Sequence, residues 1–386
     1  MASAPLLFTP LALRGVTAKN RIAVSPMCQY SAKDGHVTDW HDAHHARFAL
    51  GGVGIAIVEA TGVEARGRIT HGCTGLWSDA QVEGMARLVR LYKRHGVVPG
   101  IQIGHAGRKA SSQRPWEGGG PLGEKDAARG DAPWLTVAPS PEPMGEGWHA
   151  PHPLSAAEIV GVVGAFAAAA RRARLAGFEA LEIHGAHGYL VHSFLSPISN
   201  RRNDAYGGDL ARRMRFALEV AEAVRAEWPE GLPLFYRASS VDGVEGGLTI
   251  EDTIELAKAL KARGVDVIDC SSGGVLGPTV TSAGRVRPKQ GFQVPYAERV
   301  RRDAGMMTMC VGMVRDADYA EAILKGGRAD IVALGRELLY NPNWALHAAQ
   351  ALGADPEFAA WPVQYVWTLS RRAKTLTMPV DGDDRA

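Results

Sequence analysis

The chain has 386 residues, and 46% of them are hydrophobic, which is enough apolar material for a large buried core. Its 43 basic and 41 acidic side chains are interspersed and leave a formal net charge of +2, so we expect neither a nucleic-acid partner nor an anionic membrane partner. No apolar run approaches the length that spans a bilayer, and the first residues carry no secretory signal pattern.

Eight short apolar stretches run along the chain, and a segment of helical period separates most of them. In chain order they are Arg21–Pro26, Val53–Glu59, Val98–Ile103, Ala180–His184, Pro233–Arg237, Val265–Cys270, Met307–Val311 and Ile331–Leu334. Because a parallel strand is reached through a crossover helix, eight strand–helix units predict a closed (β/α)8 TIM barrel of the α/β class. We expect residues 1–386 to form a single domain.

The remaining elements fit around these strands. Residues 6–20 are interpreted as an N-terminal hairpin that plugs the bottom of the barrel. Helices are predicted at Asp79–His95, Ala156–Ala176, Arg212–Trp228, Thr249–Arg263, Tyr296–Asp303 and Asp316–Lys325, and an eighth is expected to begin near Pro342. In front of Ala156–Ala176, Ser155 and Glu158 have the spacing of a capping box, and Gly177 suits the position after the last turn. The tail, residues 361–386, ends in a polar stretch, Met378–Ala386, that we expect to be frayed.

One segment breaks the alternation. Residues 105–153, after the third strand, are rich in glycine, proline, tryptophan and charge and show little periodicity. The loops that follow barrel strands surround the active site, so a long insertion here predicts a lid or a substrate-shaping loop. The alternative is a surface excursion without a role.

The most specific local signal is His184-Gly185-Ala186-His187-Gly188-Tyr189, directly after the fourth strand. Imidazole N–H groups can donate to a substrate oxygen, and a phenol that is protonated at neutral pH can deliver a proton. The alternatives are a pair of structural histidines or a metal site. A metal site needs a third ligand, and Glu182 is the nearest acid without being fixed as one, so we expect no metal.

Two other groups of strand ends carry chemistry. Ser25-Pro26-Met27-Cys28-Gln29-Tyr30 ends the first strand, and its thiol suits a nucleophile, a metal ligand or a redox tuner, although inert packing is the better explanation when the motif is taken alone. The seventh and eighth strands end in Gly312 and in Gly335-Arg336, where bare backbone and a guanidinium predict a phosphate-bearing cofactor. Gly51-Gly52-Val53-Gly54 precedes a strand and therefore fails as a dinucleotide fingerprint.

Polar residues inside apolar runs need partners. Arg237 ends the fifth strand, where an arginine is costly unless it meets an anion; the alternative is a pair with a buried carboxylate such as Asp266 or Glu182. Gln102 ends the third strand, and its amide suits the edge of a heterocycle. A histidine cluster on the expected first helix lacks a facing acid or cysteine and is interpreted as surface and packing: His41, His44 and His45.

The four cysteines are widely spaced and include no C-x-x-C pair: Cys28, Cys73, Cys270 and Cys310. The spacing gives no sign of a disulfide framework or of an iron–sulfur ligand set. We therefore expect a cytoplasmic protein.

Together these motifs resemble the Old Yellow Enzyme family of flavin ene-reductases, in particular its thermophilic-like branch, which includes xenobiotic reductases. The resemblance runs from Asn20 to about Tyr365. It is carried by Ser-Pro-Met-Cys-Gln-Tyr at 25–30, Val-Glu-Ala-Thr at 58–61, Gln-Ile-Gly-His-Ala-Gly-Arg-Lys at 102–109, His-Gly-Ala-His-Gly-Tyr at 184–189, Asp-Ala-Tyr-Gly-Gly at 204–208 and Gly-Arg-Glu-Leu-Leu at 335–339.

The resemblance implies one FMN at the barrel mouth, with NAD(P)H as its hydride donor. The residues implied to line the flavin ring are Ser25, Pro26, Met27 and Cys28, and those implied to contact its polar edge are Ala60 and Gln102. Arg237 would stabilise the reduced flavin, and the phosphate would be held by Gly312, Gly335 and Arg336. The implied substrate contacts are His184 and His187, Tyr189 as proton donor, and Tyr30. Cys28 would tune the flavin potential and contact the substrate, and a homodimer or homotetramer is implied.

The implied reaction is the ping-pong reduction of the C=C bond of an α,β-unsaturated carbonyl or nitro compound, with hydride leaving flavin N5. One alternative is a dienoyl-CoA reductase-like enzyme or an amine dehydrogenase, which would carry a cysteine cluster and an extra nucleotide-binding domain. Another is a phosphate-binding barrel without redox activity, such as an aldolase. An aldolase would want a lysine at a strand end, and Lys109 lies beyond one.

Overall fold

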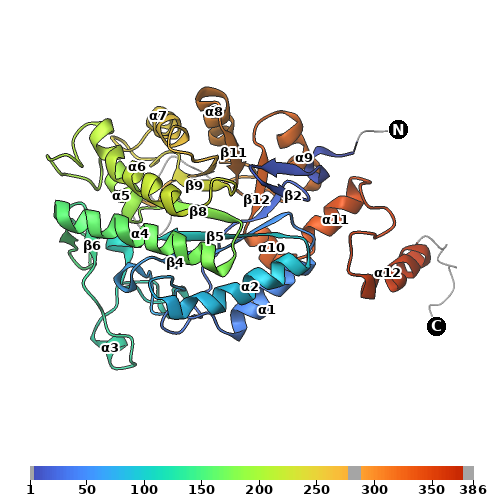
Figure 1. Cartoon of the computed structure of the whole chain (residues 1–386), viewed down its shortest axis with the longest axis horizontal. Helices are drawn as coiled ribbons and strands as arrows, with labels where there is room; N and C mark the ends of the chain where they lie inside the picture. Colours follow the sequence, from blue (N-terminus) through green and yellow to red (C-terminus); the bar gives the residue numbers. More distant parts are fainter. Residues whose placement is uncertain (1–3, 277–287, 377–386) are drawn as a thin grey trace, which may run out of the picture.

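The computed structural model describes residues 4–276 and 288–376. Eight parallel strands close into a barrel in the order β10-β11-β12-β3-β4-β5-β8-β9, and helices surround it (Figure 1). The strands are β3 Ile22–Val24, β4 Ile55–Gly62, β5 Val98–Gly104, β8 Ala180–Gly185, β9 Leu234–Ser239, β10 Val267–Ser271, β11 Met307–Cys310 and β12 Ile331–Leu334. Each overlaps one predicted stretch, so the predicted (β/α)8 barrel is confirmed.

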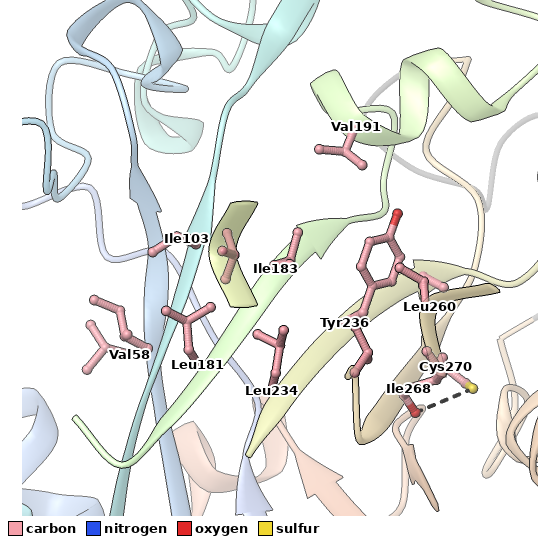
Figure 2. Close-up of a cluster of buried hydrophobic side chains, with 14 of the residues drawn as sticks. Val58, Ile103, Leu181, Ile183, Val191, Leu234, Tyr236, Leu260, Ile268 and Cys270 are labelled. Carbon is pink, nitrogen blue, oxygen red and sulfur yellow. Dashed lines mark hydrogen bonds between the residues drawn. The ribbon is translucent and has the colours of Figure 1, made fainter. Parts of the chain in front are cut away.

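Side chains along each strand alternate between the barrel interior and the helix layer. In β8, Leu181 and Ile183 belong to the large core between strands and helices, whereas Ala180 belongs to the inner core. Figure 2 shows the outward layer, in which neighbouring strands contribute Val58, Ile103, Leu234, Tyr236 and Ile268. Burial of each such aliphatic side chain contributes roughly 1.5–3 kcal/mol to stability.

An antiparallel hairpin, β1 Leu11–Leu13 with β2 Val16–Ala18, precedes the barrel. Its apolar side chains pack with inward-facing residues near the N-terminal ends of the strands, among them Ile55 and Phe235. The hairpin therefore closes one end of the barrel, and the carboxyl ends of the strands form the other.

The helices that follow the strands are α1 Asp39–Leu50, α2 Val82–Arg94, α4 Ala156–Ala176, α6 Leu210–Glu227, α7 Ile250–Lys261, α8 Val294–Ala304, α9 Ala317–Lys325, α10 Arg336–Tyr340 and α11 Trp344–Ala351. A short helix absent from the prediction, α5 Leu190–Leu195, follows β8. The prediction for α4 is confirmed at both ends. No helix within the described ranges has both the length and the apolar character needed to cross a membrane.

A helix begins close to the predicted start near Pro342, but it is the second helix after β12 and not the first. α10 begins at Arg336, directly after β12, and α11 begins at Trp344. Gly335, with φ −109° and ψ −98°, lets the chain turn from strand to helix within one residue, so no connecting loop is needed.

The insertion at residues 105–153 contains α3 Glu124–Ala127 and a short parallel pair, β6 Val137–Ala138 with β7 His152–Pro153. Lys109 Nζ donates to the carbonyl of His187, after β8, at 2.7 Å. Arg114 Nε donates to the carbonyl of Tyr30, after β3, at 3.3 Å. The insertion thus borders the open end of the barrel.

The last described helix, α12 Val363–Leu376, stands apart from the barrel (Figure 1). None of its residues is buried, and Trp367 is 62% exposed. The stretch Met378–Ala386, predicted to be frayed, lies outside the described residues.

We expect Gly177→Ala to lower the free energy of unfolding by about 1–2 kcal/mol, because Gly177 ends α4 with φ 88°, where a Cβ is strained. Gly161→Ala, inside the same helix, should raise it by about 0.5–1 kcal/mol, since alanine is the better helix former and an added Cβ meets no heavy atom within 4 Å. Urea denaturation followed by circular dichroism measures both. Shifts of the same sign for the two variants would contradict the assigned end of α4.

Candidate active site

A cavity of about 490 Å³ opens at the carboxyl ends of the strands, within the usual size range of small-molecule sites. Most of the residues expected to hold a cofactor line it: Ser25, Pro26, Met27, Arg237, Gly312, Gly335 and Arg336. Ala60 lines a second, much smaller cavity together with His184 and Tyr189. Gln102 lies buried in the barrel interior, on β5.

One side of the large cavity combines bare backbone with positive charge. Gly312 has φ 128°, and an added Cβ there would lie 3.1 Å from Gln293 Oε1, so glycine is required. Arg336 lines this side, and so does Arg315, which sequence reasoning missed although it follows Gly312 by three residues. Glycine N–H groups with two guanidinium groups suit a phosphate.

Other residues of the cavity lining suit a planar ring. Pro26 and Met27 present apolar surface to the cavity, and Arg237 reaches it from β9. Arg237 Nε is buried and has no well-aligned hydrogen bond within the described residues. A phosphate-bearing flavin therefore fits these residues in charge and in polarity.

His184, His187 and Tyr189 meet at the end of β8. The ring centroids of His184 and His187 are 5.3 Å apart, and those of His184 and Tyr189 are 4.8 Å apart, both edge to face. His187 has φ 61°, a strained conformation that its N–H supports by donating to Ser239 Oγ at 2.8 Å. Its Nε2 also contacts Ser271, which lines the large cavity. The structure thus brings the three residues of this motif together beside the cavity.

Burial sets the protonation of this cluster. Burial and the nearby positive charge of Arg237 hold the pKa of His184 and that of His187 well below the ordinary value of about 6.5. Burial also raises the pKa of Tyr189 above its usual value. At neutral pH the site therefore presents two neutral imidazoles and a protonated phenol.

The hydrogen-bond network assigns the tautomers of both imidazoles. His184 Nδ1 accepts from the backbone N–H two residues later at 3.3 Å, so its proton is on Nε2. His187 Nε2 lies 2.6 Å from Ser271 Oγ. Gln293 is satisfied when its amide nitrogen donates to a strand-end carbonyl and its oxygen accepts from the Ser271 hydroxyl at 3.1 Å. Because that hydroxyl donates to Gln293, His187 Nε2 is the donor to Ser271.

The loop after β3 carries Cys28 and Tyr30. Burial and the nearby Glu59 carboxylate raise the pKa of Cys28 well above the usual value, so the thiol stays protonated at neutral pH and is a poor nucleophile. Tyr30 has φ 50°, and its ring meets Trp116 of the insertion edge-on with centroids 6.2 Å apart. The two aromatic rings thus join this loop to the insertion.

The histidines of α1 are buried, so their interpretation as surface residues is wrong, while packing is right: His41, His44 and His45. His41 has an acid partner that the sequence did not indicate, because its Nε2 faces Glu59 Oε1 at 3.2 Å. Glu59 Oε2 in turn accepts from the backbone N–H of Gln29 at 2.7 Å. The network anchors the chain between Cys28 and Tyr30.

A second buried network supports the turn before Tyr189. His192 Nδ1 accepts from the N–H of Gly188 at 2.8 Å, and its Nε2 faces Asp242 Oδ1, after β9, at 3.0 Å. The spacing of four residues between Gly188 and His192 was the available sequence signal. Asp242 carried no such signal in the sequence, because its partner His192 follows a different strand.

Arg237 pairs with a carboxylate that the sequence did not single out. Its Nε lies 3.0 Å from Asp269 Oδ2. Neither predicted partner is the one observed: Asp266 pairs with an arginine of the N-terminal hairpin turn at 2.7 Å, and Glu182 accepts from a glutamine at 2.7 Å. The reason is register, since Arg237 and Asp269 are aligned neighbours on β9 and β10.

Lys109, which the sequence placed beyond the strand ends, lies at the site. Its Nζ is 5.2 Å from the centroid of the Tyr189 ring. Burial lowers the pKa of Lys109 to about 7. Within the described ranges, no group of three or more His, Cys, Asp or Glu side chains is arranged to hold a metal ion.

Comparison with known proteins places this geometry in a family. The model of the NADH:flavin oxidoreductase / NADH oxidase family matches residues 6–355. An NADPH dehydrogenase of Geobacillus sp. (strain WCH70) is 46% identical over 350 residues, which cover 90% of this chain and 95% of the relative. The NADPH dehydrogenase of Bacillus subtilis (strain 168) is 45% identical over 361 residues, which cover 93% and 98%.

Solved structures agree in fold. The Old Yellow Enzyme homologue from Zymomonas mobilis superposes with a TM-score of 0.73 at 25% identity, covering 94% of this chain and 96% of that one. Morphinone reductase in complex with tetrahydroNAD superposes with a TM-score of 0.69 at 26% identity, covering 90% and 91%. The chain therefore belongs to the NADH:flavin oxidoreductase / NADH oxidase family, that of Old Yellow Enzyme, and is an FMN-dependent NAD(P)H oxidoreductase.

Proposed function

We propose that this oxidoreductase is an ene-reductase that reduces the C=C bond of α,β-unsaturated carbonyl or nitro compounds in a ping-pong cycle. The observation that carries the proposal is the meeting of His184, His187 and Tyr189 beside the cavity, with ring centroids 5.3 and 4.8 Å apart. Bound FMN supplies the hydride, which NAD(P)H delivers to it and which the alkene β-carbon receives.

The protein's part is to hold the substrate oxygen and to supply a proton. His184 offers its Nε2–H to the carbonyl or nitro oxygen, on which negative charge develops. His187 donates its Nε2–H to Ser271 in the substrate-free site and turns it to the same oxygen when substrate binds. Removal of one such preorganised donor typically costs about 2.7–4 kcal/mol of transition-state stabilisation. Tyr189, protonated at neutral pH, donates its proton to the α-carbon. Tyr30 is a second substrate contact, from the loop after β3.

The remaining site residues hold the cofactor. The flavin ring is assigned to Ser25, Pro26, Met27 and Cys28, its polar edge to Ala60 and Gln102, the reduced ring to Arg237, and the phosphate to Gly312, Gly335 and Arg336. Cys28 also tunes the flavin potential and contacts substrate as a protonated thiol. We assign the whole chain to one FMN-binding domain that works in the cytoplasm, in keeping with its four free thiols.

The second candidate function is the chemistry of the larger flavoproteins of this fold, such as an amine dehydrogenase. Histamine dehydrogenase from Rhizobium sp. 4-9 shares the fold at 24% identity with a TM-score of 0.73, and this chain covers 48% of its length. The cysteines do not favour that chemistry, because all four are separate free thiols and three of them are buried.

Anaerobic half-reactions test the function. NADPH should bleach the flavin, and 2-cyclohexenone, but not saturated cyclohexanone, should restore its colour. Tyr189→Phe should slow this reoxidation by roughly 10²–10⁴-fold and leave reduction by NADPH nearly unchanged, because only reoxidation needs the proton. Tyr206→Phe is the matched control, since that hydroxyl contacts Glu219 on α6. Failure of 2-cyclohexenone to reoxidise the wild-type flavin, or equal slowing of both half-reactions, would contradict the proposal.

We expect both imidazoles to remain neutral at pH about 6.5, where an ordinary histidine is half protonated, because burial lowers the pKa of each. Nitrogen chemical shifts of ¹⁵N-histidine-labelled protein report charge and tautomer. His184→Asn and His187→Asn variants assign the signals, and an exposed histidine such as His95 is the internal control. A charged ring at this pH would mean that the pair does not act as neutral donors.

We also propose that the protein works as a homodimer or homotetramer assembled through α12. A 14-residue helix is marginal in water by itself, yet none of the residues of α12 is buried, and Val363 and Trp367 are 76% and 62% exposed. A second copy covering these side chains accounts for the helix.

Light scattering should show the full chain as a dimer or tetramer. A chain ending at residue 360 should shift toward monomer, because it lacks the apolar face of α12. Arg372→Ala is the matched control on the same helix and should leave the mass unchanged. A monomeric full chain at micromolar concentration would contradict the assembly.

A further inference from the structure

Four polar side chains form one layer inside the barrel, beneath the cavity. They come from four consecutive strands: Gln102 on β5, Glu182 on β8, Arg237 on β9 and Asp269 on β10. Gln102 is aligned with Glu182, and Arg237 with Asp269. All four are buried, and the two acids are at most 1% exposed.

The contacts divide this layer into two pairs. Gln102 Nε2 donates to Glu182 Oε1 at 2.7 Å. Arg237 Nε lies 3.0 Å from Asp269 Oδ2. Glu182 Oε2 and both oxygens of Asp269 have no well-aligned hydrogen-bond partner within the described residues, although the two carboxyl groups are neighbours that interact.

One positive charge cannot balance two buried carboxylates. Arg237 is the cation of the layer, so a second negative charge would stay uncompensated at a substantial cost. Two carboxyl groups in one buried site normally hold one proton between them. Burial raises the pKa of both acids, and it raises that of Glu182 well above the usual value. Arg237 lies 3.0 Å from Asp269 and opposes the rise there, so the proton belongs on Glu182. Its acid O–H then faces the unpartnered oxygens of Asp269.

We propose that Glu182 and Asp269 share a single proton and are positioning residues for FMN. Ionised Asp269 is the counter-charge that orients Arg237 toward the flavin and limits how strongly Arg237 stabilises the reduced ring. Neutral Glu182 orients the amide of Gln102. The inference depends on the cofactor and not on which substrate reoxidises it. It makes the layer a determinant of the flavin reduction potential, since the reduced flavin is the more negative form.

The test is the two-electron potential of bound FMN, measured by dye equilibration without any alkene. Asp269→Asn removes the carboxylate that pairs directly with Arg237 and should favour reduced FMN by about tenfold or more, a positive shift of about 30 mV. Glu182→Gln preserves the pattern, because the glutamine oxygen accepts from Gln102 and its NH₂ donates to Asp269, so the potential should stay near wild type. Asp266→Asn, a strand-start acid outside the layer, is the matched control.

Each other outcome overturns the proposal. Equal positive shifts in Asp269→Asn and Glu182→Gln would mean that both acids are ionised. No shift of the potential in either variant would mean that the layer does not act on the flavin. The potentials are measured without alkene, so they remain interpretable even if the alkene reaction fails.

A measurement that needs no stable Asp269 variant complements the potentials. The infrared spectrum of wild-type protein with ¹³C-labelled glutamate should contain the C=O band of a buried protonated acid, sensitive to the label and lost in Glu182→Gln. Absence of that band from the wild type would overturn the shared proton directly.

Discussion

Closure of eight parallel strands into a ring is the constraint on which the rest of the molecule depends. It sends every carboxyl end to one rim, and the hairpin β1–β2 closes the other end. Residues as distant in sequence as Met27 and Gly335 therefore line the same cavity. The interior that closure creates is also shielded from solvent, so each polar group in it must find a partner or give up its charge.

Burial in that interior gives the site its chemical character. The same burial lowers the pKa of His184 and raises that of Tyr189, so the imidazole is neutral and the phenol is protonated at one pH. Arg237 adds to the effect on the imidazole and is itself matched by Asp269. Reactive side chains, cofactor side chains and the acid layer beneath them thus belong to one electrostatic system.

The sequence predicted what depends on local pattern and missed what depends on register. The eight apolar stretches located the barrel strands, and the capping pattern of Ser155 with Gly177 located both ends of α4. The partners of Arg237 and His41 were not predictable in this way, because each comes from another element. Arg237 meets Asp269 through strand alignment, and His41 meets Glu59 where α1 packs against β4.

The candidate site divides in the same manner. Its strand-end residues could be listed from the sequence, because the active site of a (β/α)8 barrel lies at the carboxyl ends of the strands. The positions of Arg315 and Lys109 at the site were not predicted, because both residues lie in loops, whose path depends on what they contact. The helix α12 was not predicted; its apolar side chains have no core to pack against in this chain, and none of its residues is buried.

The insertion at 105–153 is fastened across the mouth at widely separated points. Arg108 Nη2 donates to the carbonyl of Val275 after β10 at 2.7 Å, Lys109 holds the turn after β8, and Arg114 holds the loop after β3. An engineer who exchanged this segment between two such enzymes would have to transplant its basic anchors as well. The anchoring side chains bind backbone carbonyls, which are present whatever the local sequence. New substrate selectivity is therefore more readily introduced between the anchors than at them.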